Sequence, residues 1–339
     1  DALDWVEYCN GDSDSKWGSV RAERGHAEPY NVTIWYLGNE IAVQSRYVNY
    51  PENMTRVPPP GGWEYANIGA NLVTKMLKVD PTLKLIAAGS TRMYWNIGFL
   101  EKVGKHLWAA SLHHYFDDKV QSPSDVSKAP YTEYLPLATQ FRALLDAAVE
   151  NHTVLISSDE WGVNAWKDTE VGAPQSLTAI SMIVFLLKHS KELRIGAANF
   201  FMPINEGFIR VGPFTSKLTP LGEVAELLGQ HQGRQRLDIN FSEDADVIII
   251  ASMSSNSLLL TLANRAIESR FQNVAIINGT GIGDLSDYAE AVIFKSNGTT
   301  TKDGFEKIYT VTTVTKLGEV SVEIPAYSIV RLSINFTSA

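Results

Sequence analysis

Apolar residues gather in short runs over the first two thirds of the chain, and longer segments with helical periodicity separate these runs. The runs predict strands at 32–37, 83–88, 109–113, 153–157 and 195–202. Between them, apolar residues recur every three or four positions, which predicts helices over 66–78, 137–149 and 176–188. Strands that alternate with helices at this spacing are typical of parallel β/α units.

The pattern changes after Arg234. Short β-branched runs then follow one another closely, at 247–251, 258–262, 274–277, 291–294 and 320–324. Asn-Gly and Asp-Gly pairs typical of hairpin turns stand between several of them, so this part is predicted to be an antiparallel β-sandwich. A last helix is expected from Thr219-Pro220-Leu221 to Leu228. We therefore predict a parallel α/β part over residues 1–225, which would hold a catalytic site if there is one, and a β-sandwich domain over residues 226–339.

Charge and hydropathy narrow the choice of partner. Apolar residues make up 45% of the chain, and the formal net charge is −9. A nucleic acid or an anionic membrane attracts basic surfaces, so neither is an expected partner. No run approaches the ~20 apolar residues of a membrane span. A neutral ligand such as a polysaccharide or an oligosaccharide fits this balance.

Cysteine content and glycosylation motifs point in opposite directions. Cys9 is the single cysteine, so no internal disulfide can form, which is typical of a reducing compartment. The motif Asn-X-Ser/Thr occurs more often than the roughly two or three times that chance predicts. We therefore expect a secreted or lysosome-like glycoprotein, with candidate sites at Asn31, Asn53, Asn151, Asn240, Asn278, Asn297 and Asn335.

Two of the predicted strands lead into a glutamate with polar and aromatic neighbours. Glu40 closes the segment Trp35-Tyr36-Leu37-Gly38-Asn39-Glu40, and Glu160 lies in Ile156-Ser157-Ser158-Asp159-Glu160-Trp161. In a β/α barrel the site forms at the carboxyl ends of the strands, where a partly desolvated glutamate can act as a general acid. A lone Asn-Glu pair is more often a helix cap. Two carboxylates that end strands of one parallel sheet are the minimum equipment for cleaving a glycosidic bond.

The neighbouring side chains suit a sugar ligand. Asn39 can donate a hydrogen bond to a sugar hydroxyl, and the Trp161 indole offers an apolar face and an N–H group. Tyr115, in His113-His114-Tyr115, can hold a carboxylate nucleophile in place. Either histidine could instead bind a metal, but no third ligand with zinc-like spacing stands nearby in the sequence, so we expect no metal and no cofactor.

Short motifs follow one another through the chain in a fixed order. They are Asp4-Trp5-Val6-Glu7-Tyr8-Cys9-Asn10, Glu28-Pro29-Tyr30-Asn31-Val32, Trp35 through Glu40, Ser111-Leu112-His113-His114-Tyr115, Asp159-Glu160-Trp161 and Ile324-Pro325-Ala326-Tyr327-Ser328. As an ordered set they resemble glycoside hydrolase family 51, the α-L-arabinofuranosidases. The resemblance implies an α/β fold: the C-terminal part of a (β/α)8 TIM barrel, strands 4 to 8, and then an antiparallel β-sandwich closed by the last motif.

The resemblance also implies a retaining mechanism. Glu160 is the implied nucleophile and Glu40 the implied acid and base, with their carboxyl groups ~5–5.5 Å apart. Asn39 is expected to bind the sugar 2-hydroxyl, and Tyr115 to bond Glu160. His113, Trp161 and Asn199, which ends the last barrel strand, complete the implied substrate-binding residues.

Two departures from the family pattern bear on substrate choice. Ile41-Ala42-Val43-Gln44 and a Pro-rich insertion replace the segment that usually follows Glu40, and Gly162 replaces the usual Asn after Trp161. The leading interpretation is an exo-acting α-L-arabinofuranosidase on plant-type polysaccharides. An endo-β-glucanase or other β-glycosidase on the same scaffold stays open, as does a carbohydrate-binding protein without catalysis.

The chain holds about five barrel strands, and the resemblance makes the strand before Glu40 the fourth. Five parallel strands would leave two edges exposed, which a soluble protein avoids. Our hypothesis is that a second polypeptide, cleaved from the same precursor and still docked, supplies the first barrel strands.

Overall fold

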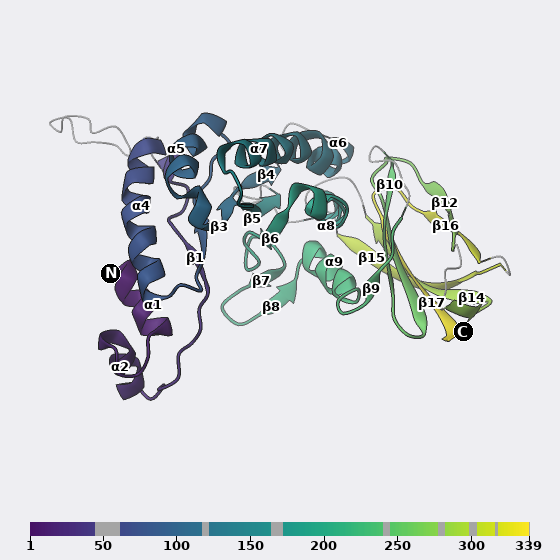
Figure 1. Cartoon of the computed structure of the whole chain (residues 1–339). Coiled ribbons are helices and arrows are strands. Elements are labelled where there is room, and N and C mark those ends of the chain that lie inside the picture. The colour runs from purple at the N-terminus through teal and green to yellow at the C-terminus, as the bar shows by residue number, and fades with distance from the viewer. Residues whose placement is uncertain are drawn as a thin grey trace. The chain divides into compact units, whose positions relative to one another are not determined.

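The chain forms two compact units. The computed structural model describes residues 1–44, 62–116, 122–163, 172–239, 245–276, 282–297, 304–315 and 318–338. Unit 1 comprises residues 1–114, 136–160 and 190–199, and unit 2 comprises residues 115–135, 161–189 and 200–339 (Figure 1). The domain boundary after residue 225 stays a prediction.

A largely parallel sheet runs through unit 1, and three of its strands end in residues assigned to unit 2. Its strands run in the order β1-β2-β3-β5-β4, and β6 pairs with β5; they are β1 (Ile34–Tyr36), β2 (Lys84–Ala87), β3 (Leu107–Ser111), β4 (His114–Phe116), β5 (Leu155–Val163) and β6 (Ile195–Phe200). β1, β2, β3 and β5 pair in parallel, in that order. Leu85, Ile86, Ala109, Ala110 and Ile156 are fully buried, which explains why these strands read as continuous apolar runs.

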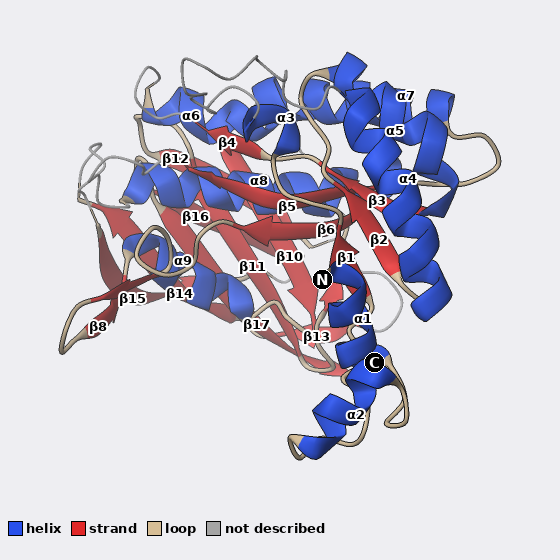
Figure 2. Ribbon diagram, turned by 90° about the vertical axis from the view of Figure 1, so that its left-hand side faces the viewer, coloured by secondary structure: helices blue, strands red, loops and turns tan. Residues whose placement is uncertain are grey.

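Helices precede, separate and follow these strands along the chain. They are α1 (Ala2–Asn10), α2 (Lys16–Glu23), α3 (Ile41–Gln44), α4 (Gly62–Val79), α5 (Met93–Val103), α6 (Pro123–Ala129), α7 (Leu135–Ala148), α8 (Ala173–Leu193) and α9 (Pro220–Gly229), with short helical turns at Gly104–His106 and Pro130–Tyr134. In Figure 2, α4, α5 and α7 lie along β2 and β3. The predicted helices correspond to α4, α7, α8 and α9. Among the described residues, no helix combines the length and the apolar character that crossing a membrane requires.

The sandwich in unit 2 has one large and one small antiparallel sheet. The large sheet runs in the order β15-β14-β17-β11-β10-β9, with β13 beside β17, and the small sheet is β12-β16. Their bounds are β9 (Gln235–Arg236), β10 (Val247–Met253), β11 (Ser257–Asn264), β12 (Arg270–Ala275), β13 (Ile282–Leu285), β14 (Tyr288–Ser296), β15 (Phe305–Thr313), β16 (Glu319–Ile324) and β17 (Ile329–Ser338). A separate hairpin joins β7 (Ile209–Val211) and β8 (Ser216–Leu218).

Both the barrel strands and the sandwich confirm the predicted fold class, with one correction. The closing strand was expected at Ile324–Ser328, but β16 ends at Ile324 and the closing strand is β17. Pro325 has no backbone N–H to give to a ladder, and Tyr327 has a φ of 49°. The segment is therefore the turn that leads into the closing strand.

The large sheet is buried on both faces, which explains the unbroken apolar run of β10. Val247, Ile249 and Ala251 point towards the core shared with the small sheet. Ile248 and Ile250 point the other way, towards a second core that includes residues of α8 and α9. Because neighbouring residues of a strand face opposite sides, a strand between two cores needs an apolar residue at every position.

A partly buried histidine makes the stability of unit 2 depend on pH. The ring nitrogens of His231 hydrogen-bond to Ser252 Oγ at 2.7 Å and to Thr261 Oγ1 at 2.9 Å. Burial, helped by the charges of Arg234 and Arg331, lowers the pKa of His231 to about 4 from an ordinary value of 6.5. The folded state therefore favours the neutral ring.

We predict that His231→Gln flattens the pH dependence of unfolding between pH 6.5 and 4. The unfolded histidine takes up a proton near pH 6.5 and the folded one only near pH 4. The contribution is therefore complete above pH 6.5 and is lost as the pH falls towards 4. Urea unfolding at several pH values measures it. Equal slopes for His231→Gln and wild type would refute this role.

Candidate functional site

Glu40 stands on a strained turn just beyond the carboxyl end of β1. The Leu37 N–H still donates to the carbonyl of Ile86 on β2, at 2.8 Å. Gly38 then has a φ of 107° and Glu40 a φ of 49°. Glycine adopts a positive φ readily, but for Glu40 it costs about 1–3 kcal/mol. Such strain persists only where surrounding contacts impose it, and it is typical of functional sites.

Tyr65 of α4 holds this turn against β2. Its hydroxyl donates to the Leu37 carbonyl at 2.9 Å and accepts from the Ala88 N–H at 2.9 Å. Burial raises the pKa of Tyr65 to about 12, although the bond from Ala88 opposes the shift. The phenol thus remains a donor at any ordinary pH and ties the carboxyl ends of β1 and β2 together. No signal in the sequence marked this residue.

Glu160 lies within β5 rather than after it. The predicted strand ended at Ser157, but β5 continues to Val163, through Asp159 and Glu160. The Leu112 N–H donates to the Ser157 carbonyl at 2.8 Å, so the chain beyond β3 stays beside β5. His113 follows directly and is thereby placed next to Glu160.

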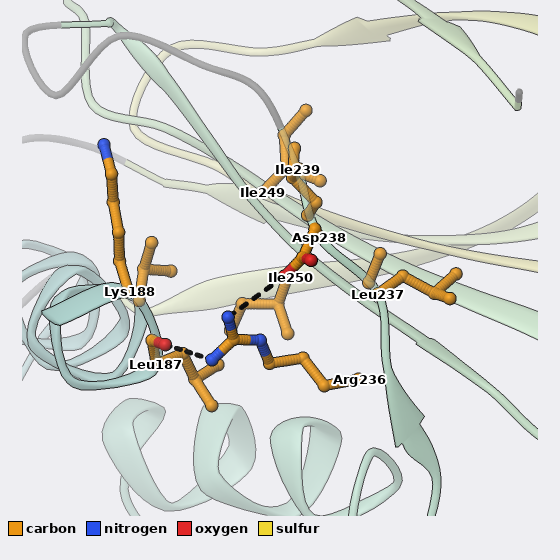
Figure 3. Close-up of a pocket in the computed structure, with 10 residues that line it drawn as sticks. Leu187, Lys188, Arg236, Leu237, Asp238, Ile239, Ile249 and Ile250 are labelled. Atoms are coloured by element: carbon orange, nitrogen blue, oxygen red, sulfur yellow. Dashed lines mark hydrogen bonds and ion pairs between the residues drawn. The ribbon is translucent and has the colours of Figure 1, made fainter. Parts of the chain in front are cut away.

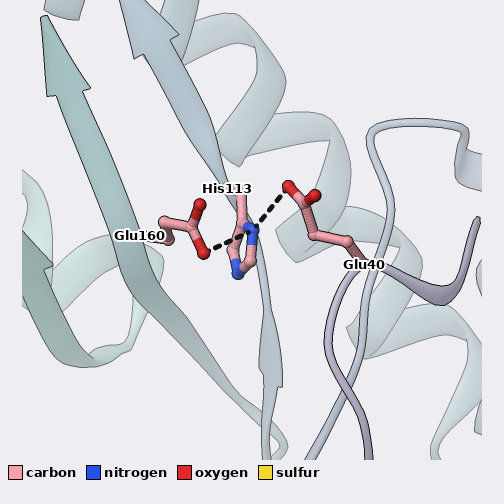
Figure 4. Close-up of side chains that lie close together, drawn as sticks. All are labelled: Glu40, His113 and Glu160. Carbon is pink, nitrogen blue, oxygen red and sulfur yellow. Dashed lines mark hydrogen bonds and ion pairs between the residues drawn. The ribbon is translucent and has the colours of Figure 1, made fainter. Parts of the chain in front are cut away.

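His113 lies between the two glutamates (Figure 4). Its Nδ1 is 3.2 Å from Oε1 of Glu40 and 3.3 Å from Oε2 of Glu160. One carboxylate oxygen of each glutamate and the histidine nitrogen all lie within 4.8 Å of one another. Three residues that are far apart in the sequence thus meet beyond the carboxyl ends of β1 and β3 and beside the second half of β5.

A third carboxylate faces the other side of the same ring. Oδ2 of Asp159 lies 3.8 Å from Nε2 of His113. Burial lowers the pKa of His113, but Asp159, Glu40 and Glu160 together outweigh it, so the pKa is raised. Burial, reinforced by the charge of Asp159, also raises the pKa of the Tyr36 phenol. The place of Asp159 beside His113 was not predicted from the sequence.

The two glutamates differ in exposure. The side chain of Glu40 is 34% exposed, whereas that of Glu160 is 15% exposed. Glu40 is therefore the carboxyl group that water and a departing group reach more readily. The Glu40–His113–Glu160 spacing would also admit a divalent cation, although sequence spacing predicted no metal-like set. A proton on His113 Nδ1 accounts for the same close approach without a metal.

The other predicted site residues have different surroundings. Asn39 and Asn199 are exposed, next to Glu40 and near the end of β6 respectively. Tyr115 is partly buried, and its ring meets Phe201 edge to face at 6.1 Å. Trp161 is only 5% exposed and meets the Phe200 ring at 5.2 Å. The structure thus brings Glu40, His113 and Glu160 together, whereas Trp161 turns little of its surface to solvent.

Steric crowding explains why a glycine, and not a larger residue, follows Trp161. A Cβ on Gly162 would lie 2.5 Å from the Phe201 carbonyl oxygen and 3.4 Å from the Tyr115 ring. The Phe201 N–H donates to the Trp161 carbonyl at 2.8 Å, which fixes that close approach. The asparagine expected from the family pattern does not fit this backbone.

Four candidate glycosylation sites lie within the described residues. Asn31, Asn151, Asn297 and Asn335 are all exposed. Asn53, Asn240 and Asn278 lie outside the described residues, as does the Pro-rich insertion at 58–62 except for its last residue. Exposure is necessary for glycosylation but does not establish it.

Unit 2 also contains a cavity of about 240 Å³ (Figure 3). Its walls are mostly apolar and come from α8, from residues 236–239 and from β10. The Arg236 guanidinium donates to the Leu187 carbonyl and pairs with Asp238 at 3.1 Å. Its charge is therefore already paired with a carboxylate of the cavity wall. None of the predicted site residues lines this cavity.

A comparison with known families matches residues 1–132 to the α-L-arabinofuranosidase 1 domain. The matched part contains Glu40 and His113 and ends before Glu160.

The chain is also similar to individual proteins of known name. The chain is 26% identical, over 171 residues, to intracellular exo-α-(1→5)-L-arabinofuranosidase 1 of Bacillus subtilis, a match that covers 48% of this chain and 32% of the relative. The chain thus spans well under two thirds of that relative's length.

Solved structures show the shared fold. The α-L-arabinofuranosidase of Thermotoga maritima in complex with arabinose superposes with a TM-score of 0.76 at 21% identity, and the family 51 (GH51) α-L-arabinofuranosidase of Thermotoga petrophila with a TM-score of 0.77 at 21% identity. Each match covers 98% of this chain and 72% of the other.

We predict that Gly162→Ala destabilises the protein by about 1–3 kcal/mol, because the new methyl group must displace the Phe201 carbonyl. Thermal unfolding measures the loss. Gly229→Ala is the matched control: no atom lies within 4 Å of the added Cβ, and alanine suits helix α9 better than glycine does. Equal melting temperatures for both variants would contradict the steric explanation.

Proposed function

These matches support the assignment of the chain to glycoside hydrolase family 51, the α-L-arabinofuranosidases, and on this premise we propose that it is a retaining glycosidase. The proposed reaction releases α-L-arabinofuranosyl residues from plant-type polysaccharides. Glu160 attacks the anomeric carbon, and Glu40 protonates the leaving oxygen and then activates water.

The observation that carries this proposal is the short distance between the two glutamates. Carboxylate oxygens of Glu40 and Glu160 lie within 4.8 Å of one another. Retaining enzymes place their carboxyl groups ~5–5.5 Å apart, and inverting enzymes keep ~6.5–9.5 Å for a water molecule. The exposures support the roles: the acid and base must reach a departing group and a water, and Glu40 is the more exposed of the two.

We predict that Glu160→Gln abolishes turnover of an aryl α-L-arabinofuranoside while sugar binding is retained. Glu40→Gln should lower turnover by about 10²–10⁴-fold for a poor leaving group, and by much less for an activated one that needs no proton. Steady-state kinetics on a series of aryl leaving groups, with calorimetric sugar binding, measures both effects. Unchanged hydrolysis by Glu160→Gln would refute its role as nucleophile.

The same assay separates the alternatives. Turnover of β-glucan polymers without turnover of the arabinofuranoside would favour an endo-β-glucanase on this scaffold. Binding without turnover of either substrate would favour a carbohydrate-binding protein. Gly162 and the residues after Glu40 are the positions where the chain departs from the family, so they are the places to look if specificity differs.

We also propose that further barrel strands, on a second polypeptide, cover the free edge of the sheet. Among the described residues, β1 pairs only with β2. Ile34 is 44% exposed and Tyr36 is 43% exposed on this edge strand. An apolar edge of this kind would otherwise pair with other chains. On α1, Trp5 is 69% exposed and lines a hollow of about 640 Å³ that the same polypeptide could fill.

We predict that the purified active protein contains a second polypeptide. Denaturing gels and mass spectrometry, under native and denaturing conditions, measure this. Full activity of a single species with the mass of this chain would contradict the proposal.

The same spectra test the proposal of a secreted or lysosome-like glycoprotein, because glycans add mass that a glycosidase removes. Unmodified sequons would instead agree with the intracellular location in the Bacillus relative's name.

A further inference from the structure

One nitrogen faces both glutamates. His113 Nδ1 lies 3.2 Å from Glu40 and 3.3 Å from Glu160, and Figure 4 shows the ring between them. An imidazole nitrogen carries at most one proton, and a good hydrogen bond needs a D–H···A angle above about 150°. The Nδ1–H group can therefore donate well to only one of the two carboxylates at a time.

Resting on the proposed function, we propose that His113 is a positioning residue whose Nδ1–H bond moves between the two catalytic carboxylates. In the structure the hydrogen bond is to Glu40, with Glu160 at ion-pair distance. The bond goes to Glu160 while Glu160 carries the negative charge, and to Glu40 while Glu160 carries the sugar. The hydrogen bond thus follows the negative charge through the reaction cycle.

The two half-reactions require such a transfer of charge. In the first, a bond forms between Glu160 and the anomeric carbon, the bond from that carbon to the leaving oxygen breaks, and that oxygen takes the proton of Glu40. Glu160 is then a neutral ester and Glu40 is anionic. In the second, Glu40 takes a proton from water, the water oxygen bonds to the anomeric carbon, and the ester electron pair returns to Glu160. His113 gains and loses no proton in either step.

A third carboxylate favours the charged form of the ring. Asp159 lies on the Nε2 side, at 3.8 Å, and is only 8% exposed. Its charge favours a protonated ring, in agreement with the raised pKa of His113. The groups that face the ring are therefore Asp159 on one side and Glu40 and Glu160 on the other. A fixed cation between two carboxylates stabilises whichever one is charged.

The inference predicts losses in both half-reactions. His113→Ala should slow glycosylation and deglycosylation alike, each by about 10- to 100-fold, the value of a charge-assisted hydrogen bond. A burst experiment with 4-nitrophenyl α-L-arabinofuranoside measures the two rates separately. His113→Asn places an N–H donor near the position of Nδ1 and should restore part of both rates, whereas His113→Gln places it near Nε2 and should not.

Several results would overturn the inference. Loss in one half-reaction only, or equal rates for the Asn and Gln variants, would show a different role. Activity that EDTA removes and Zn²⁺ restores would make His113 a metal ligand instead. Melting temperatures of the three variants report folding, and His152→Asn, at a histidine bonded to the Leu107 carbonyl, is a control that should leave both rates unchanged.

A second readout needs no turnover, so it separates this inference from the proposed function. In protein labelled with ¹⁵N-histidine, the His113 Nδ1–H proton should stay at low field in Glu40→Gln and in Glu160→Gln, because one carboxylate acceptor remains in each. It should move upfield in the double variant. A proton that moves upfield in only one single variant, and no further in the double variant, would show that it never changes partner.

Discussion

Two carboxylates that stand within 4.8 Å of one another must be kept from repelling each other. Two full charges at that distance repel by about 3 kcal/mol at an effective dielectric constant near 20. His113, with its raised pKa, supplies the compensating charge or proton between them. The arrangement of the surrounding strands can be understood as the means of placing that one imidazole between Glu40 and Glu160.

Four neighbouring strands, β1, β2, β3 and β5, meet this requirement. β1 and β5 flank β2 and β3 in the parallel sheet, so their carboxyl ends open at the same edge. Tyr65 ties the end of β1 to the end of β2, and the Leu112 N–H keeps the chain beyond β3 beside β5. The positive φ of Glu40 shows that the turn is imposed by these contacts and not by local preference.

The sequence predicts the elements well and the site only in part. Continuous apolar runs identify β2, β3 and β10 because these strands are buried on both faces, and the strand-end rule identifies Glu40 and Glu160. The pattern stops the Glu160 strand at Ser157 because the polar residues after it look like a loop, while in the structure they line the site within β5.

Other features depend on distances that no sequence pattern carries. The role of His113 depends on the register of three strands, and the reason for Gly162 lies in the carbonyl of Phe201, 39 residues further on. The short helices α1 and α2 were not predicted because each buries few apolar side chains, so their periodicity is weak.

The short distance between the carboxylates of Glu40 and Glu160 fits a double displacement, which retains the anomeric configuration. Proton NMR of the first-formed sugar tests it directly, because the anomeric signal is read before the free sugar equilibrates. We expect the released arabinofuranose to appear first with the α-configuration of the substrate. A first product with the β-configuration would mean single displacement by water, and would contradict both the assignment of Glu160 as nucleophile and the role of the imidazole between the two carboxylates.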